Sequence, residues 1–263
     1  MKRYLKIYKN LIKFAAIQET TYRVSFFLEI FVELAYIAVS ILLVKVVFWN
    51  IKEVAGWNFN MVLVLSGVNI LFIESLLGLV FIFNLRSLPD KIVKGELDLI
   101  LTKPLDSLFV ISLWRPYFAF VPSLIPGIIL IYLGFEFGNL AFNLINLIPF
   151  LIIFSCGWVI AYSLGVIISS LSFWFINADP LPNLAEELIF MSNKPFSIFT
   201  GVWKIFFLTV IPLAFMTSFP AQSLMGEFEI WWILTAVVLA VLFLLAAKLF
   251  WNFALKHYSS ASS

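Results

Sequence analysis

Among the charged residues that lie in apolar runs long enough to cross a membrane, four are the first candidates for chemistry. Glu29 and Glu33 are one helical turn apart on the same face of one run. Glu74 lies near the middle of a second run, and Arg115 lies near the start of a third. Ionisable side chains are costly in a bilayer and are often functional there. The residues leave three roles open: ion pairs that fix helix register, a lining of the substrate path, or a proton relay.

Charges also alternate with aliphatic residues throughout the segment 84–110. Ser87 to Asp90 has helix-initiating chemistry with Pro89 near the first turn, and Gly95 is placed to end a short helix after Lys94. We therefore predict a short cytoplasmic helix with an exposed apolar stripe. Such a helix either folds onto its own bundle or docks a separate soluble protein.

The sequence offers no pattern for nucleophilic, metal or nucleotide chemistry. The single cysteine, Cys156, lies in an apolar run, and the single histidine, His257, lies near the C-terminal end. No group of residues has metal-ligand spacing, and no Gly-x-x-x-x-Gly-Lys-Ser/Thr loop occurs. We predict no catalytic residue, no metal and no cofactor in this chain. An intramembrane enzyme is therefore the weakest of the function classes.

The composition places most of the chain in a membrane. Hydrophobic residues make up 63% and charged residues 12%, with a mean hydropathy of +1.05. Soluble domains average about 45–50% apolar and 25% charged residues. A net charge of +2 without a long basic tract gives no support for nucleic-acid binding. These figures exclude an ordinary soluble protein.

The apolar runs predict an all-α fold with six membrane spans, because a helix of about 20 residues crosses the bilayer core. Residues 184–199 are too polar and too short to span, so we interpret them as interfacial or re-entrant. The six predicted spans cover residues 24–49, 61–83, 111–133, 147–176, 202–219 and 230–251.

Lysine and arginine set the predicted orientation, because they favour the cytoplasmic side of short loops. Six basic residues precede the first span and four lie between the second and third, whereas the loops on the other side hold only Lys52, with Lys45 nearby. Both termini are therefore predicted to be cytoplasmic in a multi-pass protein. A cleaved leader is not expected, because the first apolar run is far longer than a signal core.

Residues 1–23 predict a basic amphipathic helix. At about 100° per residue, Lys2, Arg3, Lys6, Lys9 and Lys13 share one arc and apolar residues occupy most of the rest. Such a helix lies in the headgroup plane with its lysines toward anionic lipid. It either only anchors the first span or also touches a cytoplasmic partner.

Small residues recur every four positions along the fourth span, at Gly157, Ala161, Gly165 and Ser169. A face of small residues allows helices to approach closely. The contact that this face makes is either within one subunit or between two subunits.

The loop sequence resembles that of ABC-2 type permeases, the membrane subunits of ATP-binding-cassette transporters. The matching residues are Gly95, Glu96, Leu97, Asp98, Leu101, Pro104 and Leu105. A second similar stretch comprises residues 193–199, 211–215 and 219–221, with Lys194 where an aromatic residue is expected. Six spans and a basic start extend the resemblance over nearly the whole chain.

The resemblance implies a coupling helix that inserts into a groove on a cytoplasmic ATPase subunit. ATP and Mg²⁺ are then bound by that partner, in two copies, and a second permease, identical or related, completes about twelve spans. The resemblance also favours export across a plasma membrane, such as a bacterial inner membrane. The residues implied in ATPase coupling are Pro89, Asp90, Lys91, Gly95, Glu96, Leu97, Asp98, Leu101 and Pro104.

The alternative function is a secondary transporter or channel that works without an ATPase. Such proteins favour internal repeats and paired broken helices. The two halves of this sequence show no convincing repeat, which favours the first interpretation.

Overall fold

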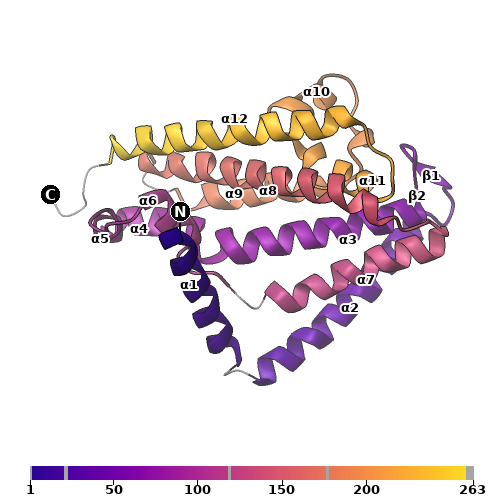
Figure 1. The fold of residues 1–263 in the computed structure, drawn as a ribbon, viewed down its shortest axis with the longest axis horizontal. Helices are drawn as coiled ribbons and strands as arrows, with labels where there is room; N and C mark the ends of the chain where they lie inside the picture. The colour runs from indigo at the N-terminus through magenta and orange to yellow at the C-terminus, as the bar shows by residue number, and fades with distance from the viewer. Residues whose placement is uncertain (1, 21–22, 118–119, 176–177, 259–263) are drawn as a thin grey trace.

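The computed structural model describes residues 2–20, 23–117, 120–175 and 178–258. These residues fold as a bundle of helices along one long axis, with a β-hairpin at one end (Figure 1). The hairpin pairs β1 (Glu53–Val54) with β2 (Trp57–Asn58), and its turn uses Ala55 and Gly56 at positive φ. The fold is therefore all-α apart from this hairpin within the described residues.

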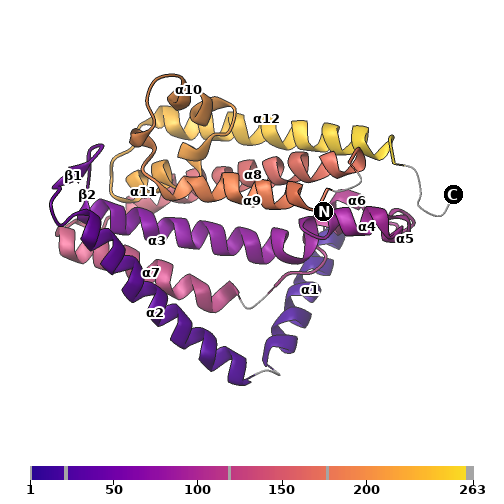
Figure 2. The same cartoon turned by 180° about the vertical axis from the view of Figure 1, so that it is seen from behind.

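Two helices open the chain and take different directions. Helix α1 (Lys2–Thr20) runs crosswise to the long axis near one end of the bundle, whereas α2 (Arg23–Val47) slants back along it (Figures 1 and 2). Arg3, Lys6, Lys9 and Lys13 are exposed, while Tyr4, Ile7, Tyr8 and Leu11 are half-buried. The basic residues thus lie on the exposed side of α1, together with the apolar residues Leu5 and Phe14.

Helix α3 (Phe59–Leu76) begins at Asn58, whose side chain accepts a hydrogen bond from the Met61 amide. It continues without a break into η1 (Leu77–Leu85), a nine-residue π-helix. Helix α7 (Phe120–Gly138) packs closely on α3 through facing glycines. A Cβ on Gly67 would lie 2.5 Å from the Gly127 carbonyl oxygen, and a Cβ on Gly127 would lie 2.9 Å from that of Gly67.

A second close pair consists of α8 (Leu147–Ser170) and α12 (Ile230–Leu255), which lie side by side in both views (Figures 1 and 2). Short 3₁₀ turns, η2 (Leu144–Asn146) and η3 (Leu171–Phe173), flank α8. The small-residue stripe on α8 is buried inside the chain. A Cβ on Gly157 would strike the Phe215 backbone, and one on Gly165 would strike the Phe81 ring. The stripe thus packs within one subunit.

The segment between α8 and α12 differs from the single fifth span expected at residues 202–219. Helix α9 (Pro180–Phe190) runs along α8, followed by the turns η4 (Met191–Asn193) and η5 (Phe196–Ile198). Helix α10 (Gly201–Thr209), the turn η6 (Leu213–Phe215) and α11 (Ser218–Leu224) then form a pair bent by 60°. Pro212 interrupts this stretch because it lacks a backbone N–H group.

Four helices among the described residues are long and apolar enough to span a membrane, or five if the bent pair counts as one span. The second apolar helix is longer than expected and runs over Phe59–Val93. The third begins at Phe120 rather than at residue 111. Helix α2 is 25 residues long, and Ala35–Val47 is the apolar stretch within its described part. The structure therefore supports a multi-pass helical protein without fixing the count at six.

Three short helices follow η1 and precede α7. They are α4 (Leu88–Val93), α5 (Glu96–Leu101) and α6 (Ser107–Leu113). They gather at the same end of the bundle as the start of α1 and the end of α12, opposite the hairpin and α11 (Figures 1 and 2).

Candidate functional site

The segment 84–115 is closed at its base by a buried asparagine. Asn84 is 1% exposed; its Oδ1 accepts from the Arg115 amide at 3.0 Å and its Nδ2 donates to the Arg115 carbonyl at 3.0 Å. The Tyr117 amide donates to the Gly78 carbonyl at 2.8 Å. These hydrogen bonds hold the two ends of the loop together, and we call the pair between Asn84 and Arg115 the Asn84 clasp. The segment is therefore a folded unit rather than a flexible linker. Sequence reasoning missed Asn84, although a lone amide in the run Phe81–Leu85 was a usable signal.

Gly95 divides the loop into two short helices where one was expected. It adopts φ +71°, in the left-handed region that glycine enters without steric cost. Helix α4 ends as the Lys94 amide donates to the Asp90 carbonyl at 2.9 Å, and α5 begins directly after Gly95. The predicted start at Ser87–Asp90 and the stop at Gly95 match the bounds of α4, while α5 was not predicted.

The two short helices bury one set of apolar residues and expose another. Leu88 and Leu97 are fully buried, whereas Val93 and Leu99 are 59% and 69% exposed. An exposed set on the loop therefore combines aliphatic and charged side chains, and we call it the loop surface. It comprises Asp90, Val93, Lys94, Glu96, Leu99 and Leu101.

The structure divides the residues that the resemblance implied in coupling. Pro89 and Leu97 are buried in the fold, so neither can meet a partner directly. Their apolar side chains anchor the loop to its own bundle, and a role of either residue in ATPase coupling stays a prediction. Lys91, Gly95 and Asp98 are half-buried, and the exposed members are Asp90, Glu96, Leu101 and Pro104.

Local charge contacts hold the loop's polar side chains in place. Lys94 Nζ lies 3.3 Å from Asp90 Oδ1 in an exposed pair one turn apart. Lys91 Nζ donates to Ser87 Oγ at 2.6 Å, and Ser87 Oγ donates in turn to the Phe83 and Asn84 carbonyls at 2.8 Å. Exposed pairs of this kind contribute little to stability, so Asp90 and Lys94 remain available to a partner.

Both ends of the described chain pack on this loop. The Asp106 amide donates to the Tyr4 hydroxyl at 3.1 Å, and the Tyr4 and Phe109 rings meet edge to face at 5.0 Å. At the other end of the chain, Trp251 Nε1 donates to Ser107 Oγ at 3.1 Å. Burial raises the pKa of the Tyr258 phenol, and the neighbouring Asp98 carboxylate adds to that rise. The phenol therefore stays neutral at physiological pH.

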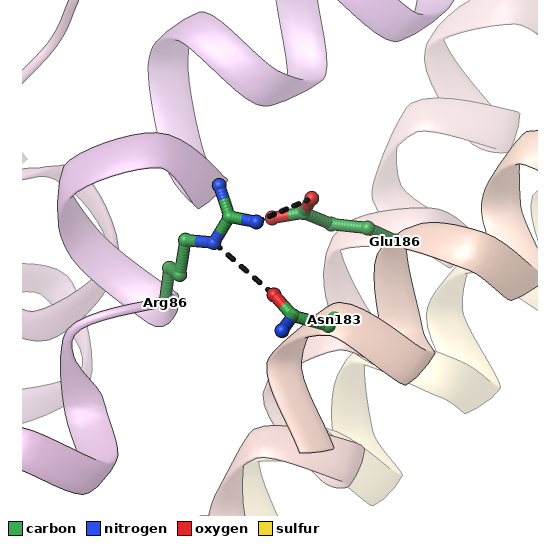
Figure 3. Close-up of polar contacts among 3 residues, drawn as sticks. All are labelled: Arg86, Asn183 and Glu186. Carbon is green, nitrogen blue, oxygen red and sulfur yellow. Dashed lines mark hydrogen bonds and ion pairs between the residues drawn. The ribbon is translucent and has the colours of Figure 1, made fainter. Parts of the chain in front are cut away.

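An ion pair joins the start of the loop to α9 (Figure 3). Arg86 Nη2 lies 3.9 Å from Glu186 Oε2, and Arg86 Nε donates to Asn183 Oδ1 at 3.1 Å. The Glu186 side chain is 11% exposed, and its Oε1 is buried with no hydrogen-bond partner among the described residues. Sequence reasoning did not connect these residues, because about a hundred positions separate them.

The charged residues expected inside the membrane take different places. Glu74 is half-buried on α3, within the second apolar run. Arg115 is exposed in the connection between α6 and α7, outside any apolar helix, because the third span begins later than expected. The side chains of Glu29 and Glu33 lie outside the described part of the structure. Within the described ranges, no three His, Cys, Asp or Glu residues gather as a metal site.

Several long apolar helices and a folded, charged loop at one end define a multi-pass membrane protein. A family model described as ABC-2 family transporter protein matches residues 34–262, and the chain belongs to that family. It is therefore a permease component of an ABC transporter, a class of membrane subunit that associates with an ABC ATPase. No curated protein and no solved structure matches the chain.

Proposed function

We propose that this chain is the permease subunit of an ATP-driven exporter and that the loop surface is where the ATPase docks. The observation that carries this proposal is that the loop surface is exposed while the loop beneath it is held rigidly on the bundle. Val93 and Leu99 are exposed on helices whose opposite face, at Leu88 and Leu97, is fully buried. The Asn84 clasp fixes the base of the loop. A push on the loop surface is thus passed to the bundle rather than absorbed by the loop.

The coupling step needs no catalytic group in this chain. ATP and Mg²⁺ are bound by two ATPase subunits, which close on nucleotide binding and displace the loops that they hold. Two permease chains, identical or related, form the substrate pathway between them, and the displacement changes which side of the membrane the pathway faces. The exposed charges at Asp90, Lys94 and Glu96 give the docking its register.

The orientation of the chain follows from the same proposal. The ATPases are cytoplasmic, so the loop end of the bundle faces the cytoplasm. Tyr4 and Tyr258 both pack at that end, which supports cytoplasmic termini, and the hairpin then faces outward. The Lys and Arg distribution of the sequence supports the same orientation in a plasma membrane such as a bacterial inner membrane.

Helix α1 supports placement of the loop end at the membrane surface. It runs crosswise to the spans, and four basic side chains on its exposed side suit anionic headgroups (Figure 1). Exposed Leu5 and Phe14 extend this side with apolar surface that suits the headgroup boundary. We place α1 in the cytoplasmic interface, with its Tyr4 contact joining it to the loop.

Affinity purification in mild detergent tests the proposed function. The tagged protein is expected to bring down a soluble ATPase in about equal amount, together with a second permease copy or a related permease. Recovery of the protein alone, stable and without an ATPase, would contradict the proposal and favour the secondary transporter or channel. A tagged Leu99→Asp variant is the internal control, because it should recover less ATPase at the same yield of permease.

A further inference from the structure

The feature that the proposed function leaves unexplained is α9, a helix packed along the bundle with its polar side chains in its middle turns. Its inner face is apolar, with Ala185 at 1% and Ile189 at 2% exposure. The middle turns carry Asn183 and Glu186, the two side chains that contact Arg86. An eleven-residue helix is about 16 Å long at 1.5 Å per residue. Helix α9 can therefore carry a displacement from one level of the bundle to another.

The far end of α9 is held by hydrogen bonds among polar residues around Ser192, a cluster that we call the Ser192 knot. Asn69 Nδ2 on α3 donates to Ser192 Oγ at 3.3 Å, and the Thr217 hydroxyl donates to the Ser192 carbonyl. Beside it, the Phe196 amide donates to Ser218 Oγ at 3.0 Å. Ser192, Thr217 and Ser218 are all at most 2% exposed. The knot ties the end of α9 to α3 and to the start of α11.

These two attachments bridge the π-helix. Asn69 lies before η1 and Arg86 directly after it, so α9 is held to the α3–η1 helix on both sides of η1. The Arg86 amide itself makes an i→i−5 bond to the Phe81 carbonyl at 3.1 Å. Nine consecutive π-helical residues are unusual, and π-helical turns occur often at functional sites. A change in the winding of η1 would alter the distance between Asn69 and Arg86, and α9 would have to follow.

We infer that Arg86, Asn183 and Glu186 are positioning residues that connect the loop to α9, so that displacement of the loop reaches α11 through η1 and the Ser192 knot. This inference rests on the proposed function, because the partner ATPase supplies the displacement. Glu186 makes the connection sensitive to its partner: with Oε1 unpaired, loss of Arg86 leaves a mostly buried carboxylate without compensation. Arg86, at 53% exposure, is the accessible half of the pair.

The test places a reporter at the opposite end of the bundle from the loop. In a Cys156→Ala background, Val202→Cys introduces a thiol at a position that is 80% exposed on α10. The protein is purified with its ATPase, reconstituted, and alkylated with a membrane-impermeant maleimide with and without ATP and vanadate. With the Arg86 contact intact, the introduced thiol is expected to show a nucleotide-dependent alkylation rate.

Glu186→Gln is expected to reduce that nucleotide-dependent change about fivefold or more, while ATP hydrolysis and recovery of the ATPase persist. Glu187→Gln, the exposed neighbour on α9, is the matched control and should behave as the parent. Asn183→Ala, which removes one exposed hydrogen-bond partner, should give an intermediate loss. It keeps the test valid if Glu186→Gln folds poorly. Arg86→Gln combined with Glu186→Gln should cost no more than either alone, since both act through one contact.

The outcomes separate the inference from the proposed function. A full nucleotide-dependent change in both Glu186→Gln and Arg86→Gln overturns the inference and leaves the docking proposal standing. The inference is also overturned, with the docking proposal standing, if the parent protein binds and stimulates its ATPase but the introduced thiol shows no nucleotide-dependent change in alkylation. Failure to recover an ATPase with the parent protein removes the proposed function, and the inference with it.

Discussion

Leu97 and Leu99 are two positions apart, but one is buried in the fold and the other is exposed on the loop surface. Leu97 is fully buried, so Leu97→Asp places a carboxylate in the apolar interior at a cost of several kcal/mol, about 3 or more. Leu99 is 69% exposed, so Leu99→Asp leaves the fold intact. We expect Leu99→Asp to weaken ATPase binding about tenfold or more, measured by co-purification and by thermal unfolding of the permease alone. Leu97→Asp should lose ATPase binding only because the permease itself unfolds, which the thermal unfolding measurement shows.

Glu96 lies on the loop surface and tests the charge of the docking site. Glu96→Arg reverses one exposed charge and should lower coupled ATP hydrolysis without affecting membrane insertion. Unchanged ATPase binding and stimulation in Glu96→Arg, at several ionic strengths, would remove Glu96 from the interface.

Glu74 and Glu53 form a second matched pair of residues. Glu74 is half-buried on α3, whereas Glu53 is exposed in the hairpin. We expect Glu74→Ala to lower transport or thermal stability by more than Glu53→Ala, because a carboxylate within an apolar helix is retained only where its surroundings compensate it. Equal effects of the two substitutions in one melting and transport assay would argue against a buried role for Glu74.

At the scale of elements, the loop depends on its clasp. Asn84→Ala removes both part-buried side-chain bonds to the Arg115 backbone, at about 1 kcal/mol per bond. We expect faster proteolysis within residues 84–115 and weaker coupling, with the long helices still protected. Limited proteolysis with mass analysis measures this. Uniform loss of protection along the chain would instead show that Asn84 supports the whole bundle.

The elements also show why some of this structure could be predicted from sequence and some could not. The bounds of α4 follow from Pro89 and Gly95, because local chemistry decides where a short helix starts and stops. The course of residues 180–224 does not follow from local chemistry. Hydropathy favoured one span at residues 202–219, but it could not show the 60° bend that the structure has in this stretch, next to Pro212. The bridge from Arg86 to Glu186 depends on tertiary contact alone, and no local pattern encodes it.

For the whole molecule, the proposal fixes which end faces the cytoplasm. In a Cys156→Ala background, Leu99→Cys at the loop and Trp49→Cys near the hairpin are exposed at opposite ends, at 69% and 76% for the native side chains. We expect a membrane-impermeant maleimide added to intact cells to label the Trp49→Cys variant and to reach the Leu99→Cys variant only after the cells are opened. The reverse pattern would invert the orientation and place the loop surface out of reach of a cytoplasmic ATPase.

The glycine contact between α3 and α7 carries a consequence for how this sequence can change over generations. Gly67 and Gly127 each occupy the space that a Cβ on the other would need. A first substitution at either position is therefore penalised, and a second at the facing position deepens the penalty instead of relieving it. No compensating pair of side chains is within reach while the two backbones stay this close. Among descendants that keep this helix pair, both positions should stay glycine, even where the lipid-facing residues around them diverge freely.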